Sequence, residues 1–223
     1  YSADPGVLTP PIMDGIRQFL PRNVKNEYPN FFLKYSSDQE SNSLAGVLPK
    51  IENSTHTIIG VETTQGDVFG AFCSSPWKVG SEWFGSRDSF LWRLSKSRVR
   101  EGQENERSYN FDNELEIYQH TGSDDMIQYC TNQTLAVGGG DWRGFKNPSN
   151  EPLGIGLMID GDMMGGETNL CSTFANPRLS GENSSGTEFE VVTLEIWSLT
   201  PFTTVEKAEE GEKLEGLTGF FSP

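Results

Sequence analysis

Few side chains in this 223-residue chain have both the type and the spacing that acid–base or nucleophilic chemistry requires. The two histidines, His56 and His120, have no partner at a known motif spacing, and the chain contains no GxSxG sequence. A Ser-His-Asp site needs only proximity in space, so the sequence leaves it open without favouring it. The three cysteines and two histidines lack the close CxxC or HxxxH pairs of zinc sites. We therefore expect no bound metal and no cofactor.

Acidic residues offer two further candidate sites. Asp160-Gly161-Asp162 starts like an EF-hand calcium loop, but Met164 and Cys171 would then fill positions that need oxygen ligands. We predict a turn there instead, because Asp beside Gly tolerates turn geometry. Glu195 interrupts an apolar strand and could act as an acid or base only with a raised pKa and a second carboxylate, such as Asp88, nearby. We expect Glu195 to be a structural carboxylate.

A run of three glycines, Gly138-Gly139-Gly140, follows the apolar segment Leu135-Ala136-Val137. Glycines after a strand can cradle a phosphate, but no GK[ST] sequence follows this run. We expect the glycines to permit positive φ or close backbone packing.

The elements that would position these residues are mostly strands. Alternation and β-rich composition predict strands over residues 31–35, 57–63, 68–73, 90–94, 115–118, 155–159 and 191–199. The turn Thr64-Gln65-Gly66-Asp67 predicts a hairpin whose two strands are apolar enough to be covered on both faces. Helices are predicted between Thr9 and Pro21 and between Ser43 and Pro49. This order predicts an α+β fold, mainly β, built as a two-sheet antiparallel β-sandwich with short peripheral helices.

Three details extend this prediction. Val192, Leu194 and Ile196 are expected on one face of the last strand. The charged segment 95–108 is predicted to be an exposed loop. The segment 206–216 carries five glutamates against two lysines and is predicted to be a solvated acidic helix or tail. We expect Phe220-Phe221 beyond it to dock on the protein.

The composition excludes several classes of protein. With 17 Lys and Arg against 32 Asp and Glu, the net charge is −15, which disfavours nucleic-acid binding and contact with anionic membranes. No apolar run in the sequence approaches the ~20 residues that span a bilayer. A content of 35% hydrophobic and 11% aromatic residues argues against disorder of the whole chain.

The cysteines are too few for a disulfide-stapled scaffold, and we expect reduced, buried thiols in a cytoplasmic protein. Their positions are Cys73, Cys130 and Cys171. Three glycosylation sequons begin at Asn53, Asn132 and Asn183, a frequency that we attribute to chance. Because the chain begins with Tyr1 rather than Met, we expect it to be a fragment.

Five ordered segments together resemble the TLDc domain family. They are Val68-Phe69-Gly70-Ala71-Phe72 with Pro76-Trp77-Lys78, Gly85 to Leu91, Leu135 to Gly140, Leu157 to Ser180 with its CSTFANPRLS sequence, and Leu194-Glu195-Ile196-Trp197. This set covers roughly Leu44 to Leu199 and is far more specific than one glycine run.

The resemblance implies a fold of two antiparallel sheets with peripheral helices. Family members are linked to resistance against oxidative stress, and several bind the vacuolar-type proton ATPase and promote or regulate its disassembly. No reaction is securely attached to the domain, so the resemblance implies a non-enzymatic protein-interaction domain. It implies this domain at 44–200, an N-terminal segment at 1–43 that packs on the core, and an acidic extension at 201–223.

The motif positions make ten residues candidates for the functional site. They are Gly85, Asp88, Ser89, Gly138, Gly139, Gly140, Thr173, Asn176, Glu195 and Trp197. The chain departs from the family at Arg87-Asp88, where Gly-Glu is usual, and an arginine at positive φ would be strained. The segments 95–108 and 142–152 are also longer than is typical of the family.

Alternatives to the interaction domain are a structural docking subunit of a larger assembly and a carboxylate-dependent enzyme of unknown reaction. A thiol-based antioxidant role would need an exposed cysteine of low pKa. Because the domain is acidic, we expect a protein partner with a basic surface, on the cytosolic face of an organelle membrane and without insertion into it. Subunits of the vacuolar-type ATPase are the partners that the resemblance implies.

Overall fold

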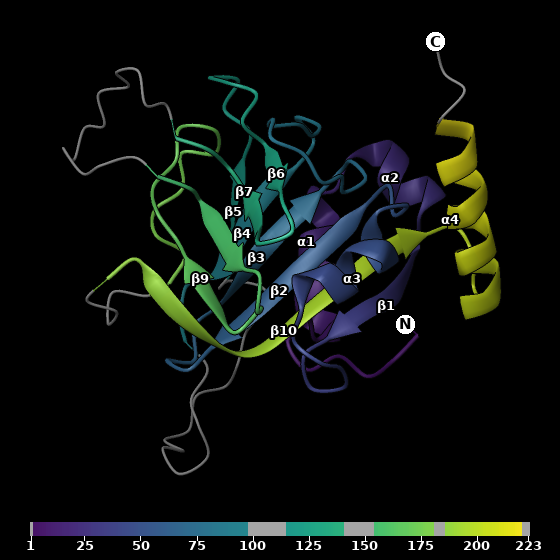
Figure 1. Cartoon of the computed structure of the whole chain (residues 1–223), viewed down its shortest axis with the longest axis horizontal. Helices are drawn as coiled ribbons and strands as arrows, with labels where there is room; N and C mark the ends of the chain where they lie inside the picture. Colours follow the sequence, from purple (N-terminus) through teal and green to yellow (C-terminus); the bar gives the residue numbers. More distant parts are fainter. Residues whose placement is uncertain (1, 98–114, 141–153, 181–185, 220–223) are drawn as a thin grey trace.

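The computed structural model describes residues 2–97, 115–140, 154–180 and 186–219, which form ten strands and four helices (Figure 1). The strands are β1 (Asn30–Ser36), β2 (Thr57–Thr63), β3 (Val68–Cys73), β4 (Phe90–Leu94), β5 (Leu115–Gln119), β6 (Gln128–Cys130), β7 (Thr134–Val137), β8 (Leu157–Asp160), β9 (Gly165–Glu167) and β10 (Glu188–Thr200). The helices are α1 (Pro10–Phe19), α2 (Arg22–Glu27), α3 (Leu44–Ile51) and α4 (Val205–Gly219).

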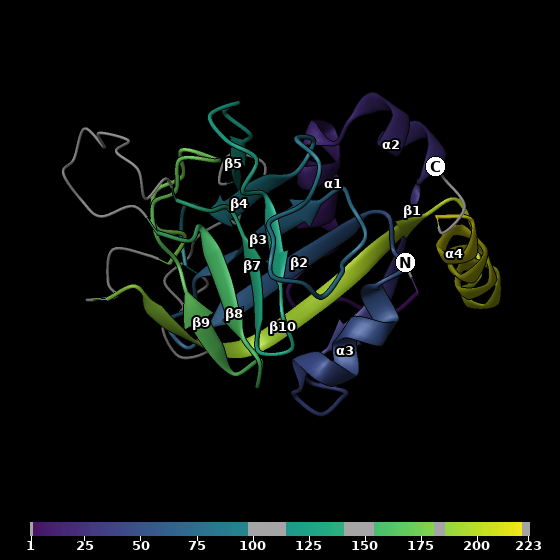
Figure 2. The ribbon, with the colours of Figure 1, turned by 45° about the horizontal axis from the view of Figure 1, so that its top comes forward.

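Antiparallel pairing joins the strands in the order β5-β4-β3-β2-β10-β9-β8-β7-β6, and β1 also pairs with β10. The long strand β10 has different neighbours along its length. Residues 188–190 pair with β9, whereas residues 195–200 pair with β1 and residues 191–198 pair with β2. Figure 2 shows β10 running from the β8–β9 side of the molecule to the β1 side. One strand therefore connects two groups of strands.

Two hydrophobic clusters cover the two faces of β2 and β3. The larger cluster joins residues from both groups of strands, for example Phe69 and Leu91 with Leu135 and Ile159. The second cluster packs residues of α1 against the opposite face of β2–β4. All residues of β3 and all but one of β2 are buried, as predicted from their apolar composition. The predicted fold class, mainly antiparallel β with short helices, is confirmed.

Pro49 does not end the second predicted helix, because α3 continues to Ile51. Pro49 lacks the N–H that would bond to the Ala45 carbonyl oxygen. However, Ile51 is fully buried, and the Glu52 N–H donates to the Leu48 carbonyl oxygen at 2.9 Å. Burial of Ile51 therefore outweighs the one lost hydrogen bond.

Val192 does not lie on the buried face with Leu194 and Ile196. The pairing of β10 with β2 shifts register between Val191 and Thr193, and Val192 is 48% exposed. Such an irregularity interrupts the alternation of side chains between the two faces of a strand.

The sequence pattern also did not predict α2, β6 and β9, which have six, three and three residues. These elements are too short to establish a period.

The acidic segment predicted at 206–216 lies within the helix α4. Among the described residues, no helix is long and apolar enough to cross a membrane. Four predicted features lie wholly or mostly outside the described residues: the loop at 95–108, the segment 142–152, the sequon at Asn183 and Phe220-Phe221.

Candidate functional site

The motif-bearing loop after β9 meets the loop before β6 at Asp124, a residue that the sequence motifs did not include. Its carboxylate accepts hydrogen bonds from the hydroxyls of Ser172 and Thr173, both at 2.7 Å. The Met126 N–H and the Ser123 hydroxyl also donate to this carboxylate, both at 3.0 Å. Asp124 therefore joins the loop before β6 to the loop after β9.

These hydrogen bonds favour the ionised form of Asp124. Burial alone raises the pKa of this carboxyl group, but the bonds from Thr173, Ser172, Met126 and Ser123 together hold it below its usual value. A bond to the N–H two residues further on is a common turn motif of aspartate. The local turn motif could be predicted from the sequence, whereas the contacts of Asp124 with the loop after β9 could not.

Thr173 and Asn176 hold the loop after β9 in place. The Thr173 hydroxyl also lies 3.1 Å from the carbonyl oxygen of Gly139. The Asn176 amide donates to the Asn169 carbonyl oxygen at 2.9 Å, and its own side-chain oxygen accepts from the Cys171 thiol at 3.0 Å. These contacts bring the predicted site residues Thr173, Asn176 and Gly139 into one cluster, hereafter the motif loop cluster, which comprises residues 120–127, 138–140 and 171–176.

The glycines at this cluster lie where a side chain does not fit. Gly138 has a φ of 81°, and a Cβ there would lie 2.8 Å from Cys171 Sγ. A Cβ on Gly139 would lie 2.5 Å from Cβ of Met126. Gly85 has a φ of 119° and would place a Cβ 2.9 Å from Ile127 Cγ2. Gly140 is buried. Gly138 and Gly85 therefore permit positive φ, and Gly138, Gly139 and Gly85 permit close packing of the backbone.

The motif segment before β4 forms a separate set of contacts. The Ser89 hydroxyl is buried and accepts a hydrogen bond from the Ser74 N–H at 3.0 Å. Asp88 is exposed. Arg87 does not have positive φ, so the strain that we considered for an arginine at this position is absent. Instead, Arg87 forms a surface ion pair with Asp125 at 2.8 Å, beside the motif loop cluster.

His56, which directly precedes β2, and Ser74, which directly follows β3, form a serine–histidine contact. The His56 Nδ1 atom lies 3.1 Å from the Ser74 hydroxyl, and the Tyr28 ring packs edge-on against the imidazole with centroids 4.7 Å apart. Burial lowers the pKa of His56 to about 4, and the charge of Asp88 offsets part of this effect. Among the described contacts, no carboxylate bonds to the imidazole. The pair therefore lacks the carboxylate that orients the histidine of a catalytic triad.

We expect mild acid to destabilise the domain through His56. Its pKa of about 4 in the folded protein lies below the ordinary 6.5, so the unfolded chain takes up the proton first as the pH falls. The stabilising effect of the neutral imidazole is complete above pH 6.5 and is lost as the pH falls toward 4. The loss should reach about 2 kcal/mol, allowing for partial solvation. Denaturant unfolding at pH 7.5 and pH 4.5 should show this loss in the wild type but not in His56→Gln, and equal losses in both would contradict it.

Glu195 and Trp197 lie on β10 and bind the N-terminal segment. The Glu195 carboxylate accepts hydrogen bonds from the Gly6 N–H at 2.5 Å, the Leu8 N–H at 3.1 Å and Trp197 Nε1 at 3.2 Å. Gly60 faces Glu195 on β2, and a Cβ there would lie 2.7 Å from Cγ of Leu8. Glu195 is thus placed as a buried carboxylate with three fixed donors.

The structure does not bring Asp88 and Glu195 together. Asp88 is exposed in the loop before β4, whereas Glu195 is 2% exposed and faces the N-terminal segment. The carboxylate pair that was considered for acid–base catalysis is therefore not formed.

The three cysteines are all buried and unpaired with one another. Burial raises the pKa of Cys73 far above its ordinary value, that of Cys130 to about 11 and that of Cys171 to about 12. A thiol that reacts with oxidants needs exposure and a low pKa. None of these cysteines has the environment of a reactive thiol.

The Asp160-Gly161-Asp162 segment forms the predicted turn, in which the Met163 N–H donates to the Asp160 carbonyl oxygen at 2.9 Å. The Met164 N–H donates to the Asp162 carboxylate at 3.0 Å. Over the parts of the chain that the structure describes, no three His, Cys, Asp or Glu side chains are placed to hold a metal ion.

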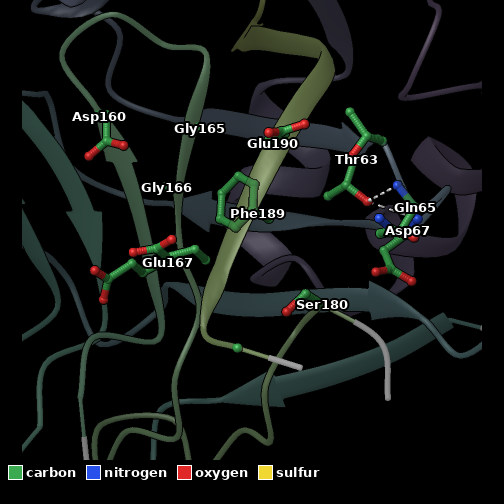
Figure 3. Close-up of a pocket in the computed structure, with 13 residues that line it drawn as sticks. Thr63, Gln65, Asp67, Asp160, Gly165, Gly166, Glu167, Ser180, Phe189 and Glu190 are labelled. Carbon is green, nitrogen blue, oxygen red and sulfur yellow. Dashed lines mark hydrogen bonds between the residues drawn. The ribbon is translucent and has the colours of Figure 1, made fainter. Parts of the chain in front are cut away.

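A cavity of about 530 Å³ lies between the β2–β3 turn and strands β8–β10 (Figure 3). Its described lining carries five carboxylates and no basic side chain: Asp67, Asp160, Glu167, Glu188 and Glu190. Figure 3 shows Asp160 and Glu167 on one side, Asp67 on the other, and Phe189 between them. None of the ten predicted site residues is part of this lining. We call this feature the acidic cavity.

Comparison with known proteins gives two results. A family model described as the TLDc domain matches residues 1–200, so the match includes the N-terminal segment held by Glu195. The chain is also similar to three proteins named Oxidation resistance protein 1. The relative from Yarrowia lipolytica is 26% identical over 204 residues, which are 88% of this chain and 75% of that protein. The relative from Podospora anserina is 27% identical over 223 residues, which cover 86% of this chain and 59% of that protein. For Saccharomyces cerevisiae the identity is 26% over 211 residues, or 86% and 72% of the two chains.

Proposed function

Because the chain belongs to the TLDc domain family, we propose that it is a non-enzymatic protein-interaction domain that acts in protection against oxidative stress. The name shared by its relatives, Oxidation resistance protein 1, supports the oxidative-stress role. We further propose that its partner is the vacuolar-type proton ATPase, whose assembly it regulates.

The observation that carries the proposal is that the motif residues of the motif loop cluster fix loops in place. Thr173 bonds to Asp124 of the neighbouring loop, Asn176 bonds to the Asn169 carbonyl oxygen of its own loop, and Gly138 permits close packing. None of these side chains lines the acidic cavity. Loops that are fixed in advance lose little conformational entropy when a partner binds, and this favours binding.

The distribution of charge supports a basic partner. The chain has a net charge of −15, and the acidic cavity concentrates five carboxylates on one described surface. Opposite charge on a partner would accelerate encounter and would make binding depend on salt.

Binding to the purified peripheral sector of a vacuolar-type ATPase tests this proposal. We expect a dissociation constant of about 1 μM or below at low salt, weakened about tenfold at high salt. The double variant Glu167→Gln/Glu190→Gln should weaken binding. The matched control, Glu206→Gln/Glu210→Gln, removes the same charge from exposed positions of α4 and should leave the affinity unchanged. Absence of binding by the folded wild type would refute the proposed partner.

A further inference from the structure

The helix α4 follows the last residue of the family match and is held to the domain by few contacts. The match ends at residue 200, and α4 begins at Val205. Of its residues whose side chains are described, 205–214, only Ala208 is buried. Figures 1 and 2 both show α4 at the edge of the molecule, beside β1 and α3. The helix therefore contributes little to the hydrophobic core.

A polar contact centred on Glu212 holds α4 to the domain. The Glu212 carboxylate forms an ion pair with Lys34 of β1 and accepts a hydrogen bond from the Ser54 hydroxyl at 3.0 Å. The two charged side chains are 7% and 12% exposed, whereas the other described ion pairs have side chains that are at least 24% exposed. Removing one partner of an ion pair so well enclosed leaves the other charge buried without compensation, which strongly weakens the attachment of α4.

The domain positions Lys34 without help from α4. The β1–β10 pairing shifts register between Leu33 and Tyr35, so Lys34 is the extra residue of an irregularity in the strand. Such bulges redirect a side chain away from the regular alternation. In addition, the Lys34 ammonium lies 4.9 Å from the centroid of the Phe32 ring. Both features belong to β1 and do not involve α4.

Space for a larger occupant exists beside this contact. A cavity of about 460 Å³ lies between α4 and the surface of β1 and α3. Its walls on the domain side include Phe32, Leu33, Pro49, Lys34 and the ion pair between Lys50 and Glu40. An apolar floor beside the Lys34 ammonium group suits a helix that carries a carboxylate next to apolar residues.

We infer that the surface formed by Phe32, Lys34, Lys50 and Ser54 is a binding site for acidic helical segments, and that α4 occupies it within the chain. The partner that this site fits is an acidic helix of another protein, which must displace α4 to bind. This surface is separate from the acidic cavity, and its test does not involve the proton pump.

A synthetic peptide of residues 204–219, which supplies α4 in trans, is the probe. The 223-residue chain with Glu212→Gln should bind this peptide about fivefold more tightly than the wild type, because a weakened internal helix leaves the site open for a larger fraction of the time. The matched control is the same chain with Glu210→Gln, which loses the same charge from an exposed position of α4 and should bind like the wild type. Fluorescence anisotropy of the labelled peptide measures both affinities.

Two further arms make the outcome decisive. Lys34→Gln added to Glu212→Gln should abolish the gain, and circular dichroism confirms that this chain is folded. In the second arm the Glu212→Gln chain is kept and the peptide is changed. A peptide that carries Glu212→Gln should bind this chain much more weakly than the wild-type peptide does. Equal affinity of the two peptides, or equal affinity of wild-type and Glu212→Gln chains, would overturn the inference.

Discussion

Replacement of Glu195 by alanine is expected to lower the free energy of unfolding by about 3–6 kcal/mol, since two buried donors would each lose this acceptor at about 1–3 kcal/mol and a part-buried donor would add a smaller loss. The donors are the N–H groups of Gly6 and Leu8 and the indole Nε1 of Trp197. A loss of this size is a large part of the 5–15 kcal/mol that stabilises a typical domain. Denaturant unfolding monitored by tryptophan fluorescence measures it.

The expected loss has a local signature as well as a global one. The N–H groups of Gly6 and Leu8 should exchange with deuterium much faster in Glu195→Ala than in the wild type. Glu190→Ala is the matched control, because Glu190 lies on the same strand with an exposed side chain. It should change stability by less than about 0.5 kcal/mol. Similar losses in both variants would show that Glu195 does not anchor the N-terminal segment.

Replacement of Asp124 by alanine is expected to cost about 2–4 kcal/mol, because bonds from two hydroxyls to a carboxylate are lost and the buried Ser172 hydroxyl loses its acceptor. The cost is smaller than for Glu195, since Thr173 retains the nearby Gly139 carbonyl oxygen. Hydrogen exchange should accelerate in both loops that Asp124 joins. If those loops form the recognition surface, binding to the ATPase sector should weaken too.

Asp125 supplies the control for this experiment. It is the adjacent residue and carries the same charge, and among the described contacts its carboxylate forms only the exposed ion pair with Arg87. Asp125→Ala should therefore cost less than about 1 kcal/mol. Unchanged loop exchange in Asp124→Ala would contradict the role of Asp124 in fixing the motif loop cluster.

The strands with long apolar or alternating patterns were predictable from the sequence. β2 and β3 are six to seven residues long and pair across the predicted turn, in which Gly66 has a φ of 83°. The path of α3 through Pro49 was not predictable, because it depends on burial of Ile51 in tertiary packing. The exposure of Val192 likewise depends on a register shift against β2.

The contacts that organise the motif loop cluster could not be predicted from the sequence. The motifs included Thr173, yet its hydrogen-bond partner Asp124 lies in a segment without a distinctive pattern. The distance of 49 positions between Asp124 and Thr173 can be closed only by the fold. The same holds for Glu195, whose partners Gly6 and Leu8 lie almost at the opposite end of the chain.

ATP-driven proton pumping by a purified vacuolar-type ATPase in sealed vesicles gives the most direct test of the proposed role. Added at about tenfold excess over a micromolar dissociation constant, the wild-type chain should occupy most of the enzyme, reduce acidification and increase release of the peripheral sector. Asp124→Ala should do so less effectively, while Asp125→Ala should match the wild type. Unchanged pumping and no bound chain, with the chain folded, would contradict the proposal that this domain acts on the proton pump.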